Sequence, residues 1–296
     1  MSLQHHLASL GAVLLALAAG LVAGVAAGGP GDGTSAGEPV LAPRAPATAA
    51  TAAPATEGEA DQLLAESLAA IVAGSLGGRQ VAVLALGAAA DPVAETVVAD
   101  LSSAGAVVSL RGTVDPSWTD PAGAVLRDGL TRQLGAEPLS AGDPLAVLLA
   151  GAATGSGAAG SSPATVWGVL AGAGLLSGTP PGDAVPEVVV VAAPATVEPA
   201  TAPGWTALIG GLAATAPVVL VAPSPGHSDQ AVGPGEASLV VAARESPAGP
   251  LLSTVDHLDT GVGRLAVLRA TADLPAGDRG HYGSLRGATS GAPARG

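Results

Sequence analysis

The chain has 296 residues, contains no Cys, and carries a formal net charge of −13 at pH 7 from 24 acidic and 11 basic residues. Without Cys there can be no disulfide scaffold, thiol nucleophile, thiolate zinc site or iron–sulfur cluster. Every basic residue is Arg and none of them cluster, so the electrostatic footprint of a nucleic-acid-binding protein is missing. We therefore expect no nucleic-acid partner.

A long uncharged apolar segment, residues 7–27, lies close to the N-terminus. As a helix it would extend about 31 Å, which matches the hydrocarbon core of a bilayer at roughly 30 Å. A cleaved secretory signal is the alternative, because Ala23–Ala27 offers small-residue cleavage sites, but the apolar region of such signals normally has only about 7–15 residues. We expect residues 1–28 to form a membrane anchor, a transmembrane or signal-anchor helix, with the chain after it extracytoplasmic.

Pro, Ala and Gly dominate residues 29–57, and large apolar side chains are scarce there. This composition cannot bury enough surface to offset the loss of chain entropy, so we expect a disordered linker. Within it, Gly33–Gly37 matches the G-x-S-x-G nucleophile elbow. That motif requires a strand before it and a helix after it, and the linker composition provides neither, so we attribute the match to chance.

A short helix is predicted over residues 58–76. Acidic residues near its start favour the helix N-terminus, Gly74 can end it, and an apolar stripe is formed by Leu64, Leu68 and Ile71. With about two heptads it is too short to form a coiled coil by itself.

Residues 77–283 combine continuous apolar runs with helix-like segments, which is typical of strands that crossover helices bury on both faces. We predict an α/β domain with a Rossmann-like, mostly parallel sheet and flanking helices, followed by a disordered tail at 284–296. Strands are expected at Gln80–Leu86, Ala106–Leu110, Val188–Ala193, Val218–Ala222, Leu239–Ala243 and Leu265–Leu268. Helices are expected from Asp91, as N-cap, to Gly105, and at 121–134, 163–176 and 204–214.

Gly155–Gly160 has the literal G-x-G-x-x-G pattern of a dinucleotide-binding loop. The chain contains 43 Gly, so about one such match is expected from composition alone. The acidic residue expected about 20 positions later is missing, because Asp183 lies too far along. The preceding run, Leu145–Ala150, fits a helix as well as a strand. We therefore favour a Gly-rich loop over a dinucleotide site.

Polar residues gather near the C-terminus, and four of them are candidate metal ligands: Asp256, His257, Asp259 and His281. Two imidazoles and two carboxylates suit Cu(II), Zn(II) or Ni(II) better than Cu(I). The alternative, which the wide spacing favours, is a structural Asp–Arg network around Arg264 with a tight turn at 280–283. No catalytic Ser, His and Asp order or carboxylate pair stands out, so we expect no enzyme.

Both ends of the chain carry a resemblance to a known family. At the C-terminus it rests on the run STVD at 253–256, Asp259, Gly263-Arg264, the Leu274–Gly277 step and GHYG at 280–283. At the N-terminus it rests on a short Ser-Leu head that leads directly into an apolar segment ending in Leu17–Gly24. In these features the chain resembles the MctB family of actinobacterial copper transport proteins.

The resemblance implies a cell-envelope protein associated with copper efflux and tolerance, in a family described as channel-forming in the outer membrane. It implies copper ions as the transported species, the membrane as a partner, and either a homo-oligomer or an envelope partner protein. We expect no tightly bound cofactor, because thiolate ligands and internal Met, the preferred ligands of Cu(I), are absent from the sequence. The alternative is an envelope-anchored scaffold or binding module without a transport role.

Overall fold

The computed structural model describes residues 57–136, 143–155, 161–225 and 236–290. The chain divides into two units, Met1–Ala53 and Pro54–Gly296. The predicted anchor (1–28) and nearly all of the predicted linker (29–57) lie outside the described residues. Among the residues that are described, no helix combines the length and the hydropathy needed to cross a membrane.

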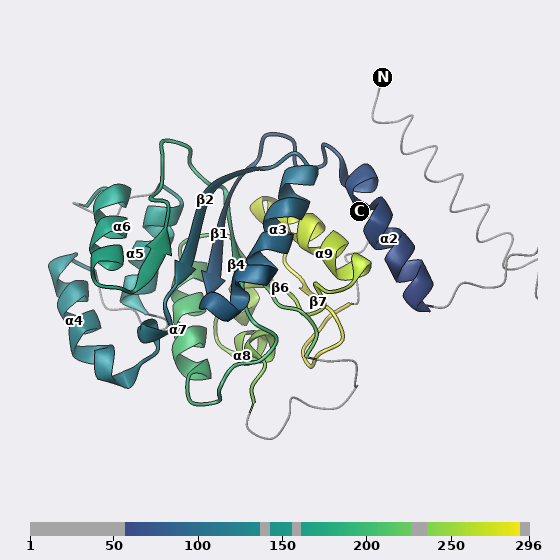
Figure 1. Ribbon diagram of the computed structural model, residues 1–296. Coiled ribbons are helices and arrows are strands. Elements are labelled where there is room, and N and C mark those ends of the chain that lie inside the picture. Colours follow the sequence, from purple (N-terminus) through teal and green to yellow (C-terminus); the bar gives the residue numbers. More distant parts are fainter. Residues whose placement is uncertain (1–56, 137–142, 156–160, 226–235, 291–296) are drawn as a thin grey trace, which may run out of the picture. The chain divides into compact units, whose positions relative to one another are not determined.

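The described part of the second unit is built on a seven-stranded sheet with the order β3-β2-β1-β4-β5-β6-β7 (Figure 1). All neighbouring strands are parallel except β3, which pairs antiparallel to β2 at one edge. The strands are β1 (Gln80–Leu86), β2 (Val107–Val114), β3 (Leu176–Gly178), β4 (Val188–Ala192), β5 (Val218–Val221), β6 (Leu252–Val255) and β7 (His281–Tyr282). The prediction of an α/β fold with a mostly parallel sheet is therefore confirmed.

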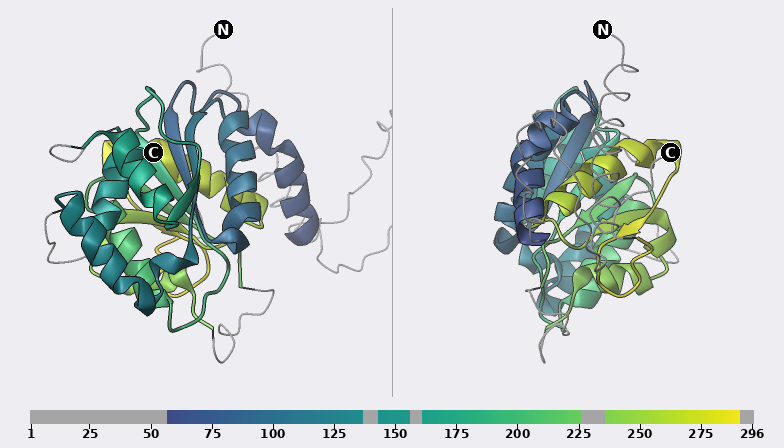
Figure 2. Two further views of the ribbon diagram at one scale, coloured as in Figure 1. Left: turned by 60° about the vertical axis from the view of Figure 1, so that its left-hand side comes forward. Right: turned by 90° about the vertical axis from the view of Figure 1, so that its right-hand side faces the viewer.

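Helices cover both faces of this sheet (Figures 1 and 2). One face carries α2 (Glu57–Val72), α3 (Asp91–Ser103) and α9 (Gly261–Asp273). The other carries α4 (Ala124–Gln133), α5 (Pro144–Ala153), α6 (Pro163–Gly172), α7 (Ala202–Ala213) and α8 (Leu239–Glu245). The central strands β1, β4 and β5 are buried on both faces, which explains why their sequences are apolar without alternation.

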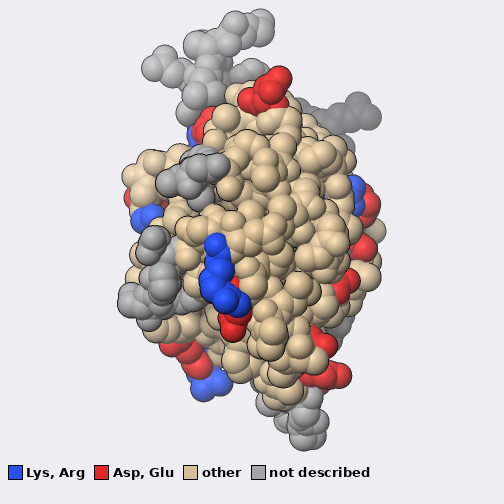
Figure 3. Space-filling model, turned by 90° about the vertical axis from the view of Figure 1, so that its left-hand side faces the viewer, with Lys and Arg blue, Asp and Glu red and all other residues tan. Residues whose placement is uncertain are grey.

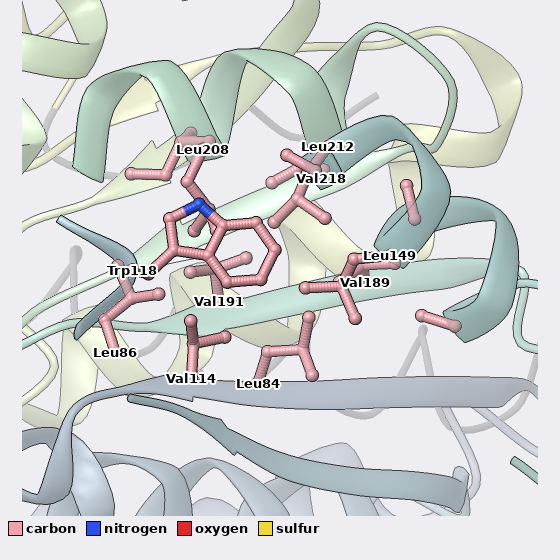
Figure 4. Close-up of a cluster of buried hydrophobic side chains, with 14 of the residues drawn as sticks. Leu84, Leu86, Val114, Trp118, Leu149, Val189, Val191, Leu208, Leu212 and Val218 are labelled. Atoms are coloured by element: carbon pink, nitrogen blue, oxygen red, sulfur yellow. The ribbon is translucent and has the colours of Figure 1, made fainter. Parts of the chain in front are cut away.

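The larger of the two buried clusters lies beneath α4 to α8 and includes Trp118 (Figure 4). In Figure 4 the Trp118 indole lies between Leu208 and Val191, and its Nε1 donates a hydrogen bond of 2.8 Å to Asp143. Asp143 also caps α5 by accepting from the Leu145 amide at 2.9 Å. A large aromatic core residue is thus fixed in orientation by the carboxylate that starts a neighbouring helix.

Four of the predicted strands are confirmed as β1, β2, β4 and β5, but two predictions were wrong. Leu239–Ala243 forms most of α8, and Leu265–Leu268 lies within α9. Both helices begin at a polar N-cap that precedes the apolar run, Ser238 for α8 and Thr260 for α9. A short apolar run fits a strand as well as a helix, and in these two segments the N-cap residue is the feature that indicates a helix.

The remaining boundary predictions were correct in part. The helix after β1 begins with Asp91, but its N-cap is Ala90, and Asp91 instead accepts a hydrogen bond from Thr113. The predicted helix 163–176 ends at Gly172, because Leu176 begins the edge strand β3. Leu145–Ala150 proves helical, as part of α5.

The C-terminal boundary also differs from the prediction. Residues 284–290, expected as the beginning of a disordered tail, are described by the structure, and the Ser284 amide donates to Asp256 at 2.9 Å. Only residues 291–296 of the predicted tail lie outside the described part of the chain.

Candidate functional site

The four predicted ligands lie at the carboxyl end of β6 and at the start of β7. Asp256 follows β6 directly, His257 and Asp259 lie in the next turn, and His281 begins β7. Because β6 and β7 are parallel neighbours, Thr254 lies opposite His281, and the topology brings these residues, 27 positions apart in the chain, to one edge of the sheet. In the sequence these residues stand out only because polar residues gather near the C-terminus; their proximity in space comes from the pairing of the two strands.

A buried ion pair dominates this region. Arg244 of α8 donates from Nη1 to Asp256 Oδ2 at 2.8 Å, and the two side chains are 1% and 0% exposed. Arg244 Nε donates to Thr254 Oγ1 at 2.7 Å, and Nη2 donates to the Tyr282 carbonyl at 3.0 Å. The guanidinium therefore joins α8, β6 and β7.

The same ion pair holds the segment 281–290, which we call the C-terminal strap. Arg244 Nη1 donates to the Leu285 carbonyl at 3.1 Å, while the amides of Ser284 and Leu285 donate to the Asp256 carboxylate at 2.9 and 3.1 Å. Gly283 lies at φ +134°, and a Cβ atom there would overlap the Asp256 carboxylate. The GHYG segment is thus a strand and loop folded around a buried carboxylate, and not an isolated tight turn.

The electrostatics of Asp256 follow from these contacts. Burial alone would raise the pKa of Asp256, but the His257 imidazole, the Ser284 amide and the Arg244 guanidinium together hold the pKa below its usual value. His257 Nδ1 lies 3.6 Å from Asp256 Oδ1, which is too long for a hydrogen bond, so the amide and the guanidinium are the firmer contacts. Asp256 is therefore an anion at neutral pH.

His281 belongs to the same hydrogen-bond network through one ring nitrogen. Its Nδ1 lies 3.2 Å from Thr254 Oγ1. Arg244 can only donate to that hydroxyl, so the hydroxyl hydrogen is available for His281 Nδ1, which then acts as acceptor. Burial, and then the charge of Arg244, lower the pKa of His281. The neutral imidazole with its proton on Nε2 fits this arrangement.

His257 and Asp259 lie in the turn between β6 and α9, where Asp259 is exposed and the His257 side chain is 12% exposed. Asp259 Oδ1 accepts from the backbone amide and the hydroxyl of Ser224, at 2.8 and 2.9 Å, and so ties this turn to the loop after β5. His257 Nδ1 is buried and has no hydrogen-bond partner in the structure. Among the described residues, no group of three or more His, Cys, Asp or Glu side chains is arranged to hold a metal ion. The four-residue ligand set stays a prediction.

The alternative prediction was an Asp–Arg network around Arg264. Asp–Arg pairs are present, but the arginine that pairs with Asp256 is Arg244 and not Arg264. Arg264 lies on α9 and pairs with Asp100 of α3, with 2.8 Å between Nε and Oδ2. Asp256 pairs with Arg244, which sequence reasoning missed because its segment was assigned to a strand. One feature of the sequence could have pointed to Arg244. It is a single Arg directly after an apolar run, and a cation in that place is favoured at the C-terminus of a helix.

Two other surfaces of the domain are large and mostly apolar. A cavity of about 650 Å³ lies between α7 and α8, and none of the described residues that line it is charged. Figure 3 shows the side of the molecule that carries α4, α5 and α6, where charged side chains are sparse. Helices α5 and α6 carry none, because no charged residue occurs between Asp143 and Asp183, whereas α4 carries Arg127, Asp128 and Arg132. The cavity offers no charged or imidazole ligand among its described lining residues.

Two motifs of the sequence lie outside the described residues. They are the G-x-S-x-G match at 33–37 and all of Gly155–Gly160 except Gly155 itself.

The fold and the C-terminal cluster define a mostly parallel α/β protein whose last segment closes over a buried Arg–Asp pair. Comparison with known families goes further, because the model of the family described as "Copper transport outer membrane protein, MctB" matches residues 1–293. The chain belongs to this family, which confirms the resemblance seen at its two ends and places it in the cell envelope. No curated protein matches the chain.

Proposed function

We propose that this chain takes part in copper efflux across the cell envelope and so in copper tolerance. The observation that carries the proposal is the family match, which extends over residues 1–293 and includes both the apolar N-terminal segment and the C-terminal cluster. The direction of transport and the formation of a channel are parts of the proposal.

In this proposal residues 7–27 anchor the chain in a membrane and residues 29–57 connect the anchor to an extracytoplasmic, Rossmann-like domain. The domain acts without catalysing a reaction. Copper is its substrate, and any contact with the ion uses imidazole and carboxylate groups, because the sequence has no Cys and its single Met is the first residue. A homo-oligomer or an envelope partner would complete the pathway.

The proposal is tested by measuring cell-associated copper in a deletion strain grown at sublethal copper. The strain is compared with the same strain carrying the intact gene and with one carrying a copy that lacks residues 1–28. Excess copper that only the intact gene removes supports membrane-dependent efflux. Equal copper in all strains would reject efflux and leave the alternative, an envelope-anchored scaffold or binding module.

The ligand prediction has a separate test. His257 and Asp259 are replaced by Gln and Asn, which keep the size and polarity of the side chains, and the same strains are assayed. An NMR titration of the His257 ring with Cu(II) is carried out on the purified chain. If the His257 signals do not respond to Cu(II) and the double variant restores normal copper content, this turn does not contact the ion.

A further inference from the structure

Helix α2 is attached to the rest of the domain at the first turn of α9. Asp61 Oδ1 of α2 accepts from the backbone amides of Gly261 and Val262, at 2.8 and 3.4 Å. A Cβ atom on Gly261 would lie 2.9 Å from the Ala65 backbone nitrogen, so the two helices cross closely at this glycine. The first amides of a helix have no partner within it, and here a carboxylate 200 residues away supplies one.

The contact continues from α9 to the C-terminal cluster. The amide and the hydroxyl of Thr260 donate to the His257 carbonyl at 3.1 and 2.9 Å, and the same hydroxyl accepts from the Gly263 amide at 2.9 Å. His257 follows Asp256, whose carboxylate holds the C-terminal strap. A continuous series of packed and hydrogen-bonded groups therefore joins α2 to the strap.

Few apolar side chains hold α2 in place. Of the α2 side chains that the structure describes, Leu68 and Val72 are large, apolar and buried, whereas Leu63 and Ile71 are 60% and 44% exposed. The helix leads into a loop with Gly74 at φ +76°. Elements with few buried contacts open before the core of a domain does, so α2 has the features of a separately opening element.

We propose that α2 is a releasable latch, which through Asp61 fixes the first turn of α9 and thereby the order of the turn after β6 and of the C-terminal strap. Any event that withdraws α2 from α9 then loosens the cluster around Asp256. Since α2 directly follows the N-terminal unit in sequence, it is the first described element that a change in that unit would reach. The inference concerns conformational coupling and does not depend on copper transport.

Hydrogen exchange of the purified full-length chain in detergent tests the latch. We compare the wild type with Asp61→Ala, with Asp61→Asn, which keeps an acceptor oxygen, and with Ser67→Ala, an exposed position on the same helix. In Asp61→Ala, exchange is expected to rise about fivefold at the amides of residues 261–263, the factor typical of a lost helix cap. It is also expected to rise at Ser284 and Leu285, while Asp61→Asn shows smaller changes and Ser67→Ala none.

A rise confined to residues 261–263 would overturn the proposal, because Asp61 would then be a local cap and nothing more. Asp61→Asn covers the case in which Asp61→Ala does not fold. A neutral amide oxygen is a weaker acceptor than a carboxylate, so exchange should still rise at residues 261–263 and, if α2 acts as a latch, at Ser284 and Leu285. A rise at residues 261–263 alone in this variant would also overturn the latch.

Discussion

Replacing Arg244 with Met removes the cation from a buried ion pair and leaves Asp256 charged in the interior. The two side chains are 1% and 0% exposed, so water cannot take the place of the guanidinium without rearrangement. Removing one partner of such a pair typically costs about 3–5 kcal/mol, because the remaining charge is uncompensated. The amides of Ser284 and Leu285 still donate to Asp256 in the variant, so we expect a loss near the middle of this range, about 4 kcal/mol.

The assay is urea unfolding of the full-length chain in detergent, followed by tryptophan fluorescence. Trp118, Trp167 and Trp205 are all buried and will report the loss of the core. A loss of about 4 kcal/mol is about a quarter or more of the unfolding free energy of a typical domain, so the urea midpoint should fall clearly.

Two comparisons make this prediction specific. Arg286→Met removes an exposed pair with Glu245, whose side chains are 79% and 51% exposed, and should cost less than about 1 kcal/mol. The double variant Arg244→Met/Asp256→Leu removes both buried charges and should recover part of the loss. The reasoning is refuted if Arg244→Met costs no more than Arg286→Met.

Three further predictions use the same unfolding assay. Gly283→Ala should cost about 2 kcal/mol or more, because φ is +134° and the new methyl group overlaps the Asp256 carboxylate; an unchanged midpoint contradicts this geometry. Leu68→Ala should lower the free energy of unfolding by about 2–5 kcal/mol, because Leu68 is buried, and its control Leu63→Ala by less than about 0.5 kcal/mol, because Leu63 is exposed. Equal losses would show that α2 does not pack as described. The folded pKa of Asp256 is lowered, so its stabilisation is fully present above the unfolded pKa and is lost as the pH falls through the folded pKa. Wild type and Arg244→Met should therefore converge in stability on acidification below about pH 4, and a constant difference would argue against an ionised Asp256.

The sequence predicts the centre of the sheet well and its last third poorly, for a physical reason. Strands β1, β4 and β5 are buried on both faces and read as unbroken apolar runs. Strand β6 contains Ser253 and Thr254, both fully buried, and their hydroxyls are satisfied by partners that sequence cannot reveal. Thr254 accepts from Arg244, and Ser253 accepts from the Gly280 amide at 3.2 Å. This strand was not among the predicted ones, because the partners of its polar side chains are distant in sequence.

The sequence shows that polar residues gather near the C-terminus, but it does not show how the fold organises them. Clustering of polar residues near the C-terminus was visible, and parallel pairing of β6 with β7 then brings Asp256 and His281 to one edge of the sheet. The identity of the cation could not be predicted, because it depends on whether residues 239–245 form a strand or a helix. As α8, this segment places Arg244 beneath β6, and Arg264 on α9 is left to pair with Asp100.

This organisation separates the four predicted ligands into two pairs with different prospects for binding copper. Asp256 is enclosed by a guanidinium and two backbone amides, and His281 Nδ1 faces Thr254, so coordination through either group would first require the C-terminal strap to open. His257 and Asp259 lie in the turn after β6, outside the strap; Asp259 is exposed, whereas the His257 side chain is 12% exposed and its Nδ1 is buried. Any role of Asp256 or His281 in copper handling is therefore linked to the order of the strap, and through the latch to α2. Substitutions at His257 and Asp259 test direct contact with the ion, whereas substitution of Asp61 tests control of the site from a distance.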